Sequence, residues 1–285
     1  MKEQSMDIVL YNPLSRNGSD PNFINKIVNK LNKQGRKAEA YSLLDIEDVD
    51  SFVSGCDKDD RLIIVGGDGT LNRLANHIYG VDIKQDIFLY QAGTGNDFAR
   101  SLKKKTKLIP IKSYLQPLPV IQYGVIDQYF LNGAGIGLDG YVGHLVNTST
   151  HKKNKFNYFR HAIEAFIKFK PLAADITVDD RSWREKKVWF VSVMHGAYFG
   201  GGMKIAPRAR REEDALYLVV AKRAPKWLLF LIFPTIYLGW HVMLKPFVSF
   251  HKGSTFKITM SDPTYVQVDG DVTYPVQEIR AKARA

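Results

Sequence analysis

The stretch RLIIVGGDGTLN, residues 61–72, joins an apolar strand-like segment to the start of a helix-like one. Its three glycines allow a sharp turn and a close approach to a ligand, and the N–H groups at the start of the following helix favour negative charge. Asp68 would repel a phosphate unless a divalent cation, or a hydroxyl that needs orienting, lies between them. The turn therefore predicts a nucleotide triphosphate and Mg²⁺ site, against the alternative that the glycines only make a tight turn.

Two further polar loops follow apolar strand-like segments. The first, Asn12–Gly18, comes after Ile8–Leu10, and the second, Gly93–Asp97, comes after Ile87–Tyr90. In an open parallel sheet, ligands bind outside the carboxyl ends of the strands. We therefore expect the three loops to form one site.

The first part of the chain alternates short apolar segments with amphipathic ones, which predicts an α/β domain with a doubly wound sheet over residues 1–125. Leu108–Leu118 is interpreted as a connector. Beyond it, strand-like segments follow one another with few helices between them, which predicts a mainly antiparallel β-sandwich over residues 126–285. These segments are 124–131, 174–178, 187–194, 216–221, 255–260 and 264–268. As an alternative, the extreme C-terminus returns to the first domain.

The loops also carry a family resemblance. Asn12-Pro13, the glycine-rich turn at 66–72 and Gly93–Arg100 resemble, in that order, the catalytic domain of diacylglycerol kinases, a family that includes sphingosine and ceramide kinases and soluble bacterial lipid kinases. The later segments 130–139, 200–207 and 268–271 are also similar to that family, so the likeness covers nearly the whole chain. It implies a fold like that of diacylglycerol kinases and NAD kinases.

The resemblance implies an ATP- and Mg²⁺-dependent kinase that phosphorylates a hydroxyl of diacylglycerol or a related lipid, giving phosphatidic acid. Asp68 and Asp97 would serve the catalytic Mg²⁺, directly or through water, with Asp127 as a weaker candidate. The residues expected to hold ATP are Asn12, Pro13, Ser15, Arg16, Gly66, Gly67, Asp68, Gly69, Thr70, Leu71, Asn72 and Thr94. Asp68 is expected to act on metal or acceptor rather than to shape the fold.

Asp271 is the candidate general base. It ends the segment Asp269-Gly270-Asp271, where the resembled family has Asp-Gly-Glu, so its side chain is one methylene shorter. An Asp-Gly hairpin turn is the structural alternative, and a turn can also present a carboxylate. Both interpretations are compatible.

The resemblance further implies a structural Mg²⁺ site, with Asp214 and the carbonyls of Arg211 and Leu216 as ligands. Here Asp214-Ala215-Leu216 replaces the family's usual Asp-Gly-Leu, and Arg211 puts a positive charge beside the site. A plain turn is an equal alternative. The seven histidines show no paired metal-ligand spacing.

The segment 227–244 is apolar nearly all round, which predicts burial in protein or contact with lipid. Its 18 residues, interrupted by Pro234 and Gly239, favour a partly buried helix at the membrane interface over a spanning one. Lys and Arg exceed Asp and Glu by 40 minus 29, or +11, and lie in clusters. We expect these clusters to meet a peripheral anionic membrane surface rather than nucleic acid, because no nucleic-acid-binding signature accompanies them.

The single cysteine, Cys56, excludes an internal disulfide, and the first residues carry no apolar secretory region. We therefore expect a cytoplasmic protein at the inner face of the membrane, and homodimer formation is one option. Two rival functions stay open. One is an NAD kinase, which would share the glycine-rich turn but phosphorylate an aqueous dinucleotide. The other is a non-catalytic lipid-binding regulatory homologue.

Overall fold

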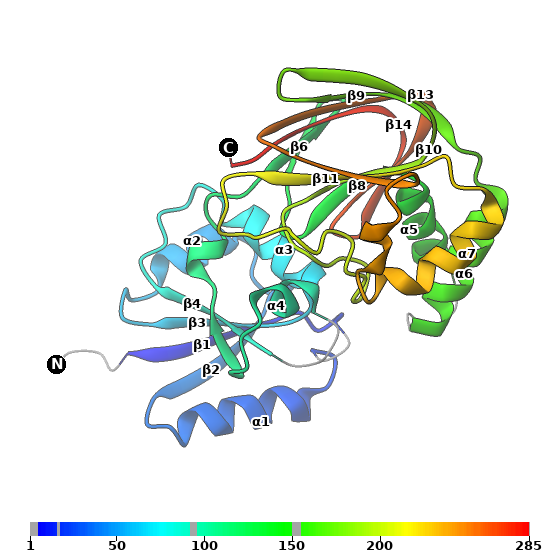
Figure 1. Ribbon diagram of the computed structural model, residues 1–285. Helices are drawn as coiled ribbons and strands as arrows, with labels where there is room; N and C mark the ends of the chain where they lie inside the picture. The colour runs from blue at the N-terminus through cyan, green and yellow to red at the C-terminus, as the bar shows by residue number, and fades with distance from the viewer. Residues whose placement is uncertain (1–4, 16–17, 92–95, 150–154, 285) are drawn as a thin grey trace. The chain divides into compact units, whose positions relative to one another are not determined.

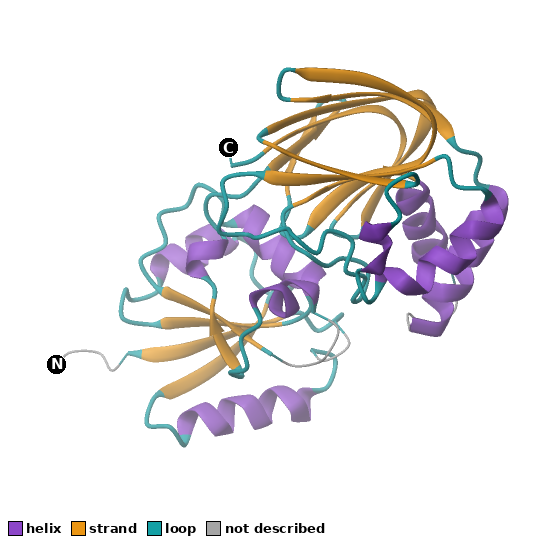
Figure 2. Ribbon diagram, viewed as in Figure 1, coloured by secondary structure: helices purple, strands orange, loops and turns teal. Residues whose placement is uncertain are grey.

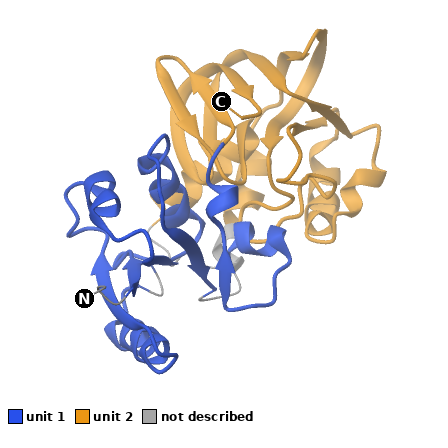
Figure 3. Cartoon of the chain, turned by 90° about the vertical axis from the view of Figure 1, so that its left-hand side faces the viewer, with its two compact units in different colours: residues 1–117 blue, residues 118–285 orange. Residues whose placement is uncertain are grey.

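The computed structural model describes residues 5–15, 18–91, 96–149 and 155–284, with the backbone alone for 155–158. The chain forms two compact units, Met1–Pro117 and Leu118–Ala285 (Figure 3). Each unit is described by itself.

The first unit is a five-stranded sheet with helices on both faces. Its sheet order is β2-β1-β3-β4-β5, in which β5 alone runs antiparallel to its neighbour. Helix α1 covers one face, and α3 and α4 cover the other (Figure 1). The elements are β1 (Met6–Tyr11), α1 (Pro21–Asn32), β2 (Lys37–Ser42), α2 (Val49–Gly55), β3 (Arg61–Val65), α3 (Asp68–His77), β4 (Asp86–Tyr90), α4 (Asp97–Leu102), β5 (Leu108–Pro110) and the 3-10 turn η1 (Lys112–Tyr114).

Local sequence signals start the helices of this unit. The Asp20 side chain accepts the N–H of Asn22 before Pro21, which takes the first helical position of α1. Asn96 caps α4 by accepting the N–H of Ala99. The central strands are apolar on both faces because helices cover both, and Val9, Ile63 and Ile64 are fully buried.

The second unit is an antiparallel sheet of nine strands with three helices at one side (Figure 2). Strands pair along β12-β11-β10-β8-β13-β14-β6-β7, and β9 pairs with both β10 and β13. Its strands are β6 (Val120–Tyr123), β7 (Ile126–Tyr129), β8 (Gly133–Gly137), β9 (Leu172–Val178), β10 (Arg181–Met194), β11 (Leu216–Lys222), β12 (Val248–Gly253), β13 (Thr255–Val268) and β14 (Asp271–Lys282). Its helices are α5 (Leu138–Thr148), α6 (Lys155–Lys168), α7 (Lys226–Ile236) and the 3-10 turn η2 (Trp240–Met243).

Two apolar cores stabilise the second unit. One lies among the strands and includes Ile136, Val191 and Ile258, all completely buried. The other lies between the sheet and helices α5, α6 and α7, and is rich in aromatic rings. The edge-to-face contacts of Phe166 with Phe230 and Phe233, at centroid distances of 5.7 and 5.2 Å, join α6 to α7.

The antiparallel character of the second unit confirms the predicted fold class, whereas several elements differ from the expectation. Helices α2 and α5 had no strong periodicity and were not predicted. The expected connector at 108–118 contributes β5 because Leu108–Pro110 completes the sheet edge. The two strands expected at 255–260 and 264–268 are one strand, β13, whose pairing shifts between Thr259 and Thr264. The segment 227–244 is divided into α7 and η2 at Gly239, whose φ is 77°.

The helical spacing of Phe156, Phe159, Ile163, Phe166 and Ile167 predicts one apolar face over residues 156–169, and the structure corrects part of it. Among residues 159–168 of α6, the buried side chains are those of His161, Ala162, Ala165 and Phe166. Ile167, expected on the inner face, is 60% exposed, and Phe159 is 40% exposed. Small alanines face inward because α6 packs closely against α5 and α7.

Candidate functional site

The register of the first sheet places three loops at one edge. Tyr11 pairs with Val65, and Val65 pairs with Tyr90, so the last residues of the three parallel strands β1, β3 and β4 lie side by side in the sheet. Asn12, Gly66 and Gln91 are the next residues after these strand ends. The predicted convergence of the loops therefore follows from strand pairing alone.

The loop after β1 is closed around the main chain of Asn12. The Asn12 carbonyl accepts the Ser15 N–H at 2.9 Å and the Ser15 hydroxyl at 2.7 Å. The Asn12 side chain accepts the N–H of Leu14, which makes an Asx turn. A Cβ at Gly18 would collide with the Asn12 carbonyl, so only glycine closes this loop. Asn12 and Ser15 thus shape the loop, and Pro13 lies within it.

The glycines of the turn after β3 have different roles. A Cβ at Gly66 would lie 2.6 Å from Cβ of Thr70, so this glycine allows the close packing of the turn on α3. Gly67 and Gly69 are exposed, and, apart from neighbouring residues of the same turn and helix, no atom of the described residues lies within 4 Å of a Cβ built on either. Neither needs a left-handed backbone. Their lack of side chains leaves open space beside the first turn of α3, as an anion-binding main chain requires.

Thr70, Leu71 and Asn72 form the inner side of that first turn. All three side chains are buried, and the Leu71 N–H donates to the Gly67 carbonyl at 3.1 Å. Gly67 at the N-cap has no side chain that could bond the N–H groups of the first turn. The first turn of α3 therefore has no side-chain cap from Gly67, and the binding of ATP phosphates by its main chain stays a prediction.

Asp68 connects two of the loops. One of its carboxylate oxygens accepts the N–H of Asp97 at 2.8 Å, and the other accepts the N–H of Phe98 at 2.8 Å. Both donors belong to the first turn of α4. The expectation that Asp68 does not shape the fold is therefore wrong, because its charge stabilises the N-terminus of α4.

Asp97 is itself buried, at 2% exposure. Its carboxylate lies 3.8 Å from Nη1 of Arg100, one turn along α4. Two of the predicted ATP-binding residues, Arg16 and Thr94, lie outside the described residues. Asp127 belongs to the second unit, where it is exposed on β7 opposite Gln122.

In the second unit, Asp269 and Gly270 form a two-residue hairpin turn. Val268 pairs with Asp271, and the φ angles of Asp269 and Gly270 are 48° and 100°. The Asp269 carboxylate accepts the N–H groups of Leu131, Asn132 and Gly133 at 2.5, 2.8 and 3.0 Å. Asp271 is the next residue along the hairpin and is exposed. The predicted turn is thus present, with one acid turned inward and the other outward.

The residues expected to hold a structural metal have a different environment. The Asp214 side chain is 72% exposed and lies 3.5 Å from Nε of Arg284. The Arg211 carbonyl lies 3.3 Å from Nε2 of His195. The Arg211 guanidinium is buried and contacts the Leu131 carbonyl and the Asn132 side chain. The Arg211 carbonyl thus faces a ring nitrogen of His195, and the Asp214 carboxylate faces the Arg284 side chain. These two oxygens are poorly placed to coordinate a divalent cation, because other groups of the protein already contact them.

His195 lies between these groups in a nearly closed environment. Its Nδ1 is 3.2 Å from the Leu131 carbonyl. Burial and the adjacent Arg211 charge lower the pKa of His195 to about 3. The ring is therefore neutral at physiological pH and donates from one nitrogen only, and a pKa this low makes it a weak proton acceptor.

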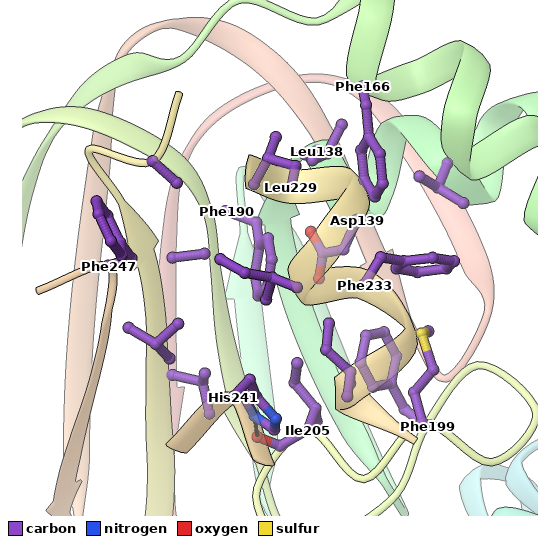
Figure 4. A pocket seen from close by; sticks show the side chains of 18 residues that line it. Leu138, Asp139, Phe166, Phe190, Phe199, Ile205, Leu229, Phe233, His241 and Phe247 are labelled. Carbon is purple, nitrogen blue, oxygen red and sulfur yellow. Dashed lines mark hydrogen bonds between the residues drawn. The ribbon is translucent and has the colours of Figure 1, made fainter. Parts of the chain in front are cut away.

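Helices α5, α6 and α7 enclose a narrow cavity of about 70 Å³ against the sheet (Figure 4). Its lining is apolar and aromatic, apart from Asp139 and His241. The cavity is lined by Leu138, Asp139, Val142, Phe166, Phe190, Phe199, Met203, Ile205, Val219, Ala221, Ala224, Leu229, Ile232, Phe233, Ile236, His241, Phe247 and Val248. Asp139 accepts the Ser192 hydroxyl at 2.8 Å and the Gly140 N–H at 2.9 Å. The lining suits the apolar end of a ligand, and the volume is well below the roughly 300 Å³ or more of pockets that enclose a whole one.

Two protein-family models match the chain. Residues 7–117 match the diacylglycerol kinase catalytic domain, and residues 133–281, more than half of the chain, match the YegS C-terminal NAD kinase beta sandwich-like domain. The chain belongs to the diacylglycerol kinase family of lipid kinases. This assignment confirms the resemblance found in the sequence.

Individual members of the family are related over most of their length. A "Diacylglycerol kinase" of Mycobacterium tuberculosis is 24% identical over 278 residues, 94% of this chain and 89% of the relative. A Bacillus subtilis protein named "Putative lipid kinase YtlR" is 32% identical over 194 residues, 60% of this chain and only 62% of the relative. A crystal structure of a diacylglycerol kinase from Bacillus anthracis has a TM-score of 0.64 at 18% identity, covering 100% of this chain and 96% of that one. At that identity the likeness shows the fold.

Two residues of this lipid kinase family member were not singled out by the sequence. Asp139 was quoted only as the last residue of the family-like segment 130–139, and nothing in that segment indicated a buried acid. Asp269 was quoted only as part of a motif, and its bonds to residues 131–133, over 130 positions away, follow from tertiary pairing.

Among the described residues, no helix combines the length and apolar character needed to cross a bilayer.

Asp139 predicts a distinctive pH dependence of stability. Burial raises its pKa from 3.8 to about 6, although hydrogen bonds from Ser192 and Gly140 oppose the shift. A raised carboxyl pKa adds stability at low pH, which is lost as the pH rises from 3.8 through 6. Relative to the parent, Asp139→Asn should therefore gain about 1.4 kcal/mol in unfolding free energy between pH 5 and pH 8.

Urea unfolding followed by tryptophan fluorescence measures this difference in the second unit alone, because all four tryptophans lie there. A difference between variant and parent that stays constant from pH 5 to pH 8 would show that Asp139 ionises normally.

Proposed function

We propose that this protein transfers the γ-phosphate of ATP to a hydroxyl of diacylglycerol or a closely related lipid, with Mg²⁺. Membership of the lipid kinase family supports the reaction class. The observation that carries the choice of acceptor is the apolar cavity under α5, α6 and α7, because an aqueous acceptor would gain nothing from such a lining.

The first unit supplies the nucleotide site in this proposal. The open space beside Gly67 and Gly69 lets phosphate oxygens reach the main-chain N–H groups of the first turn of α3. The loops that begin at Asn12 and Gln91 flank that turn because their strands end on the same line. Positioning and charge stabilisation at the phosphates are what phosphoryl transfer chiefly needs.

Bound Mg²⁺ would neutralise charge on the transferring phosphoryl group. Asp68 and Asp97 are the residues of this chain that would hold it. Both oxygens of Asp68 already accept main-chain N–H groups, and Asp97 is nearly buried. These environments fit contact through water better than direct coordination.

Asp271 accepts the proton of the acceptor hydroxyl in this proposal. Its carboxylate is exposed on a rigid two-residue turn, whereas the neighbouring Asp269 is fully used in holding that turn. A base must be reachable by its substrate and held in place. Asp271 is exposed, and the strand pairing beside the turn holds its main chain.

An acceptor panel separates the lipid kinase from its two rivals. The protein is incubated with ATP and Mg²⁺ in mixed micelles that contain diacylglycerol, a sphingoid base, ceramide, phosphatidylglycerol or undecaprenol, beside a detergent-matched reaction with NAD. We expect mass spectrometry to find a phosphorylated lipid and no NADP. Phosphorylation of NAD would favour the NAD kinase, and no product with any acceptor would favour the regulatory homologue.

We also propose that α7 and η2 dock on an anionic membrane surface at the cytoplasmic side. Large apolar side chains are exposed there, at Trp227, Leu231, Leu238, Trp240 and Met243, with exposed fractions of 57 to 69%. The sequence from Arg223 to Phe247 contains Lys226 and Lys245 and no acidic residue. Exposed aromatic and aliphatic groups with flanking lysines are typical of helices that lie in the interface.

Replacing two of these side chains should weaken binding to vesicles. Trp227→Ser with Leu231→Ser removes apolar surface that would enter the acyl boundary, at about 1 kcal/mol or more for each side chain. We expect at least a tenfold weaker affinity for vesicles of phosphatidylglycerol and phosphatidylcholine, measured by sedimentation at low salt.

Val125→Ser is the matched control, because Val125 is fully exposed on the turn between β6 and β7. It should bind vesicles as the parent does. Equal binding by all three proteins, or loss of a homodimer in the double variant, would assign the α7 surface to another role.

A further inference from the structure

Arg211 is a buried cation with an unusual set of partners. Only 5% of its surface is exposed, and its guanidinium donates to the Leu131 carbonyl and to the Asn132 side-chain oxygen. A Cβ at Gly196 would collide with the guanidinium, so this glycine makes room for it. Burying a charge is costly unless it is well bonded. The hydrogen bonds of the guanidinium must therefore offset the free energy lost when this charge is removed from water.

The Leu131–Asn132 peptide group lies between Arg211 and Asp269. Its carbonyl oxygen, that of Leu131, accepts from the guanidinium. Its N–H, that of Asn132, donates to the Asp269 carboxylate at 2.8 Å. The peptide dipole thus has its negative end at the cation and its positive end at the anion. Both contacts favour the same orientation of one peptide.

Asp269, which contacts this peptide, also begins the turn that precedes Asp271. Asp269 accepts three consecutive main-chain N–H groups and begins the two-residue turn with a left-handed backbone. The segment 131–133 is held at its other side by the N–H groups of His195 and Gly196, which both donate to the Asn132 carbonyl. The segment is therefore fixed by the two residues that follow β10, by Arg211 and by the turn.

We propose that Arg211 is a positioning residue, which holds Asp269 and the Asp271 turn through the Leu131–Asn132 peptide and makes a bound structural metal unnecessary in this chain. The importance of the Asp271 turn rests on the proposed function. The absence of a structural metal does not rest on it, because it is inferred from the surroundings of Asp214 and of the Arg211 carbonyl.

The test compares Arg211→Met and Arg211→Lys with Arg210→Gln in the full-length protein. Arg210 is the exposed neighbour, so its variant loses a charge at the adjacent position without touching the buried contacts. Hydrogen exchange by NMR reports the amides of residues 131–133, which donate to Asp269. We expect their exchange to become at least tenfold faster in Arg211→Met, less so in Arg211→Lys, and unchanged in Arg210→Gln.

Metal dependence and activity are measured on the same proteins. The parent should unfold at the same temperature with EDTA or with excess Mg²⁺, and elemental analysis should find no stoichiometric divalent metal. With the identified lipid, kcat should fall in Arg211→Met with little change in KM for ATP, and Arg211→Lys should restore part of it.

Unchanged exchange at residues 131–133 in Arg211→Met would overturn the positioning role, whatever the activity. A stoichiometric metal whose removal lowers the unfolding temperature would overturn the metal-free clause. If Arg211→Met does not fold, Arg211→Lys carries the exchange test alone, and protection equal to that of the parent overturns the proposal. Absence of kinase activity in the parent would count against the proposed function only, since the exchange and metal results do not depend on it.

Discussion

Asp271→Asn should lower kcat by about 10² to 10⁴ while leaving ATP binding and stability nearly unchanged. The amide keeps the size of the side chain but cannot accept a proton. Stability should persist because Asp271 is exposed on its turn, and Asp269, not Asp271, makes the bonds to residues 131–133. Steady-state kinetics on the identified lipid, nucleotide titration and urea unfolding measure the three quantities.

Asp271→Glu is the matched control, because it keeps the acid and restores the side-chain length typical of the family. We expect measurable activity from it. An Asn variant as fast as the parent would show that the proton leaves by another route and would reduce Asp271 to a turn residue.

Asp269→Asn, two residues away, should chiefly lower stability, whereas Asp271→Asn should chiefly lower kcat. Asparagine tolerates the left-handed backbone at this position, so the change isolates the hydrogen bonds. Its amide group must face at least one of the three N–H donors now accepted by the carboxylate. We expect a loss of about 2 to 4 kcal/mol in the unfolding free energy of the second unit, and a fall in kcat as the Asp271 turn loosens.

Urea unfolding followed by tryptophan fluorescence tests this prediction, since the four tryptophans lie in the second unit. An Asp269→Asn protein with the stability of the parent would mean that the three N–H groups find other acceptors. The pair of variants then separates structure from chemistry within a single turn: stability should fall in one, and activity alone in the other.

The sequence predicted the parts of the fold that depend on local pattern. The apolar strands at 61–65 and 86–90 and the two-residue turn at Asp269-Gly270 all carry signals within a few residues. The convergence of the first-unit loops was also predictable, because parallel strands end at one edge. That Gly67 and Gly69 hold ATP phosphates stays a prediction.

Long-range partners could not be predicted in the same way. Asp68 was interpreted as a metal or acceptor ligand, because nothing in its own segment reveals that it caps α4, some thirty residues later. Arg211 was expected to contribute a carbonyl, whereas its side chain is buried against residues from a distant strand end. The cavity around Asp139 depends on three helices that come together only in the folded unit. The apolar residues at 227–244 predicted burial in protein or contact with lipid. Helix α7 has one buried face, with Ile232 and Phe233, and one exposed apolar face, with Trp227 and Leu231.

Transfer of label from ATP to lipid tests the central claim most directly. The purified protein is incubated with Mg²⁺ and diacylglycerol in mixed micelles, in parallel with ATP labelled at the γ-phosphate and ATP labelled at the α-phosphate, and the organic extract is counted and resolved by chromatography. We predict that γ label enters the extract as phosphatidic acid, that α label does not, and that Asp271→Asn abolishes nearly all of the transfer. If no lipid of the panel gains γ label while the protein is folded and binds ATP, it is not a lipid kinase.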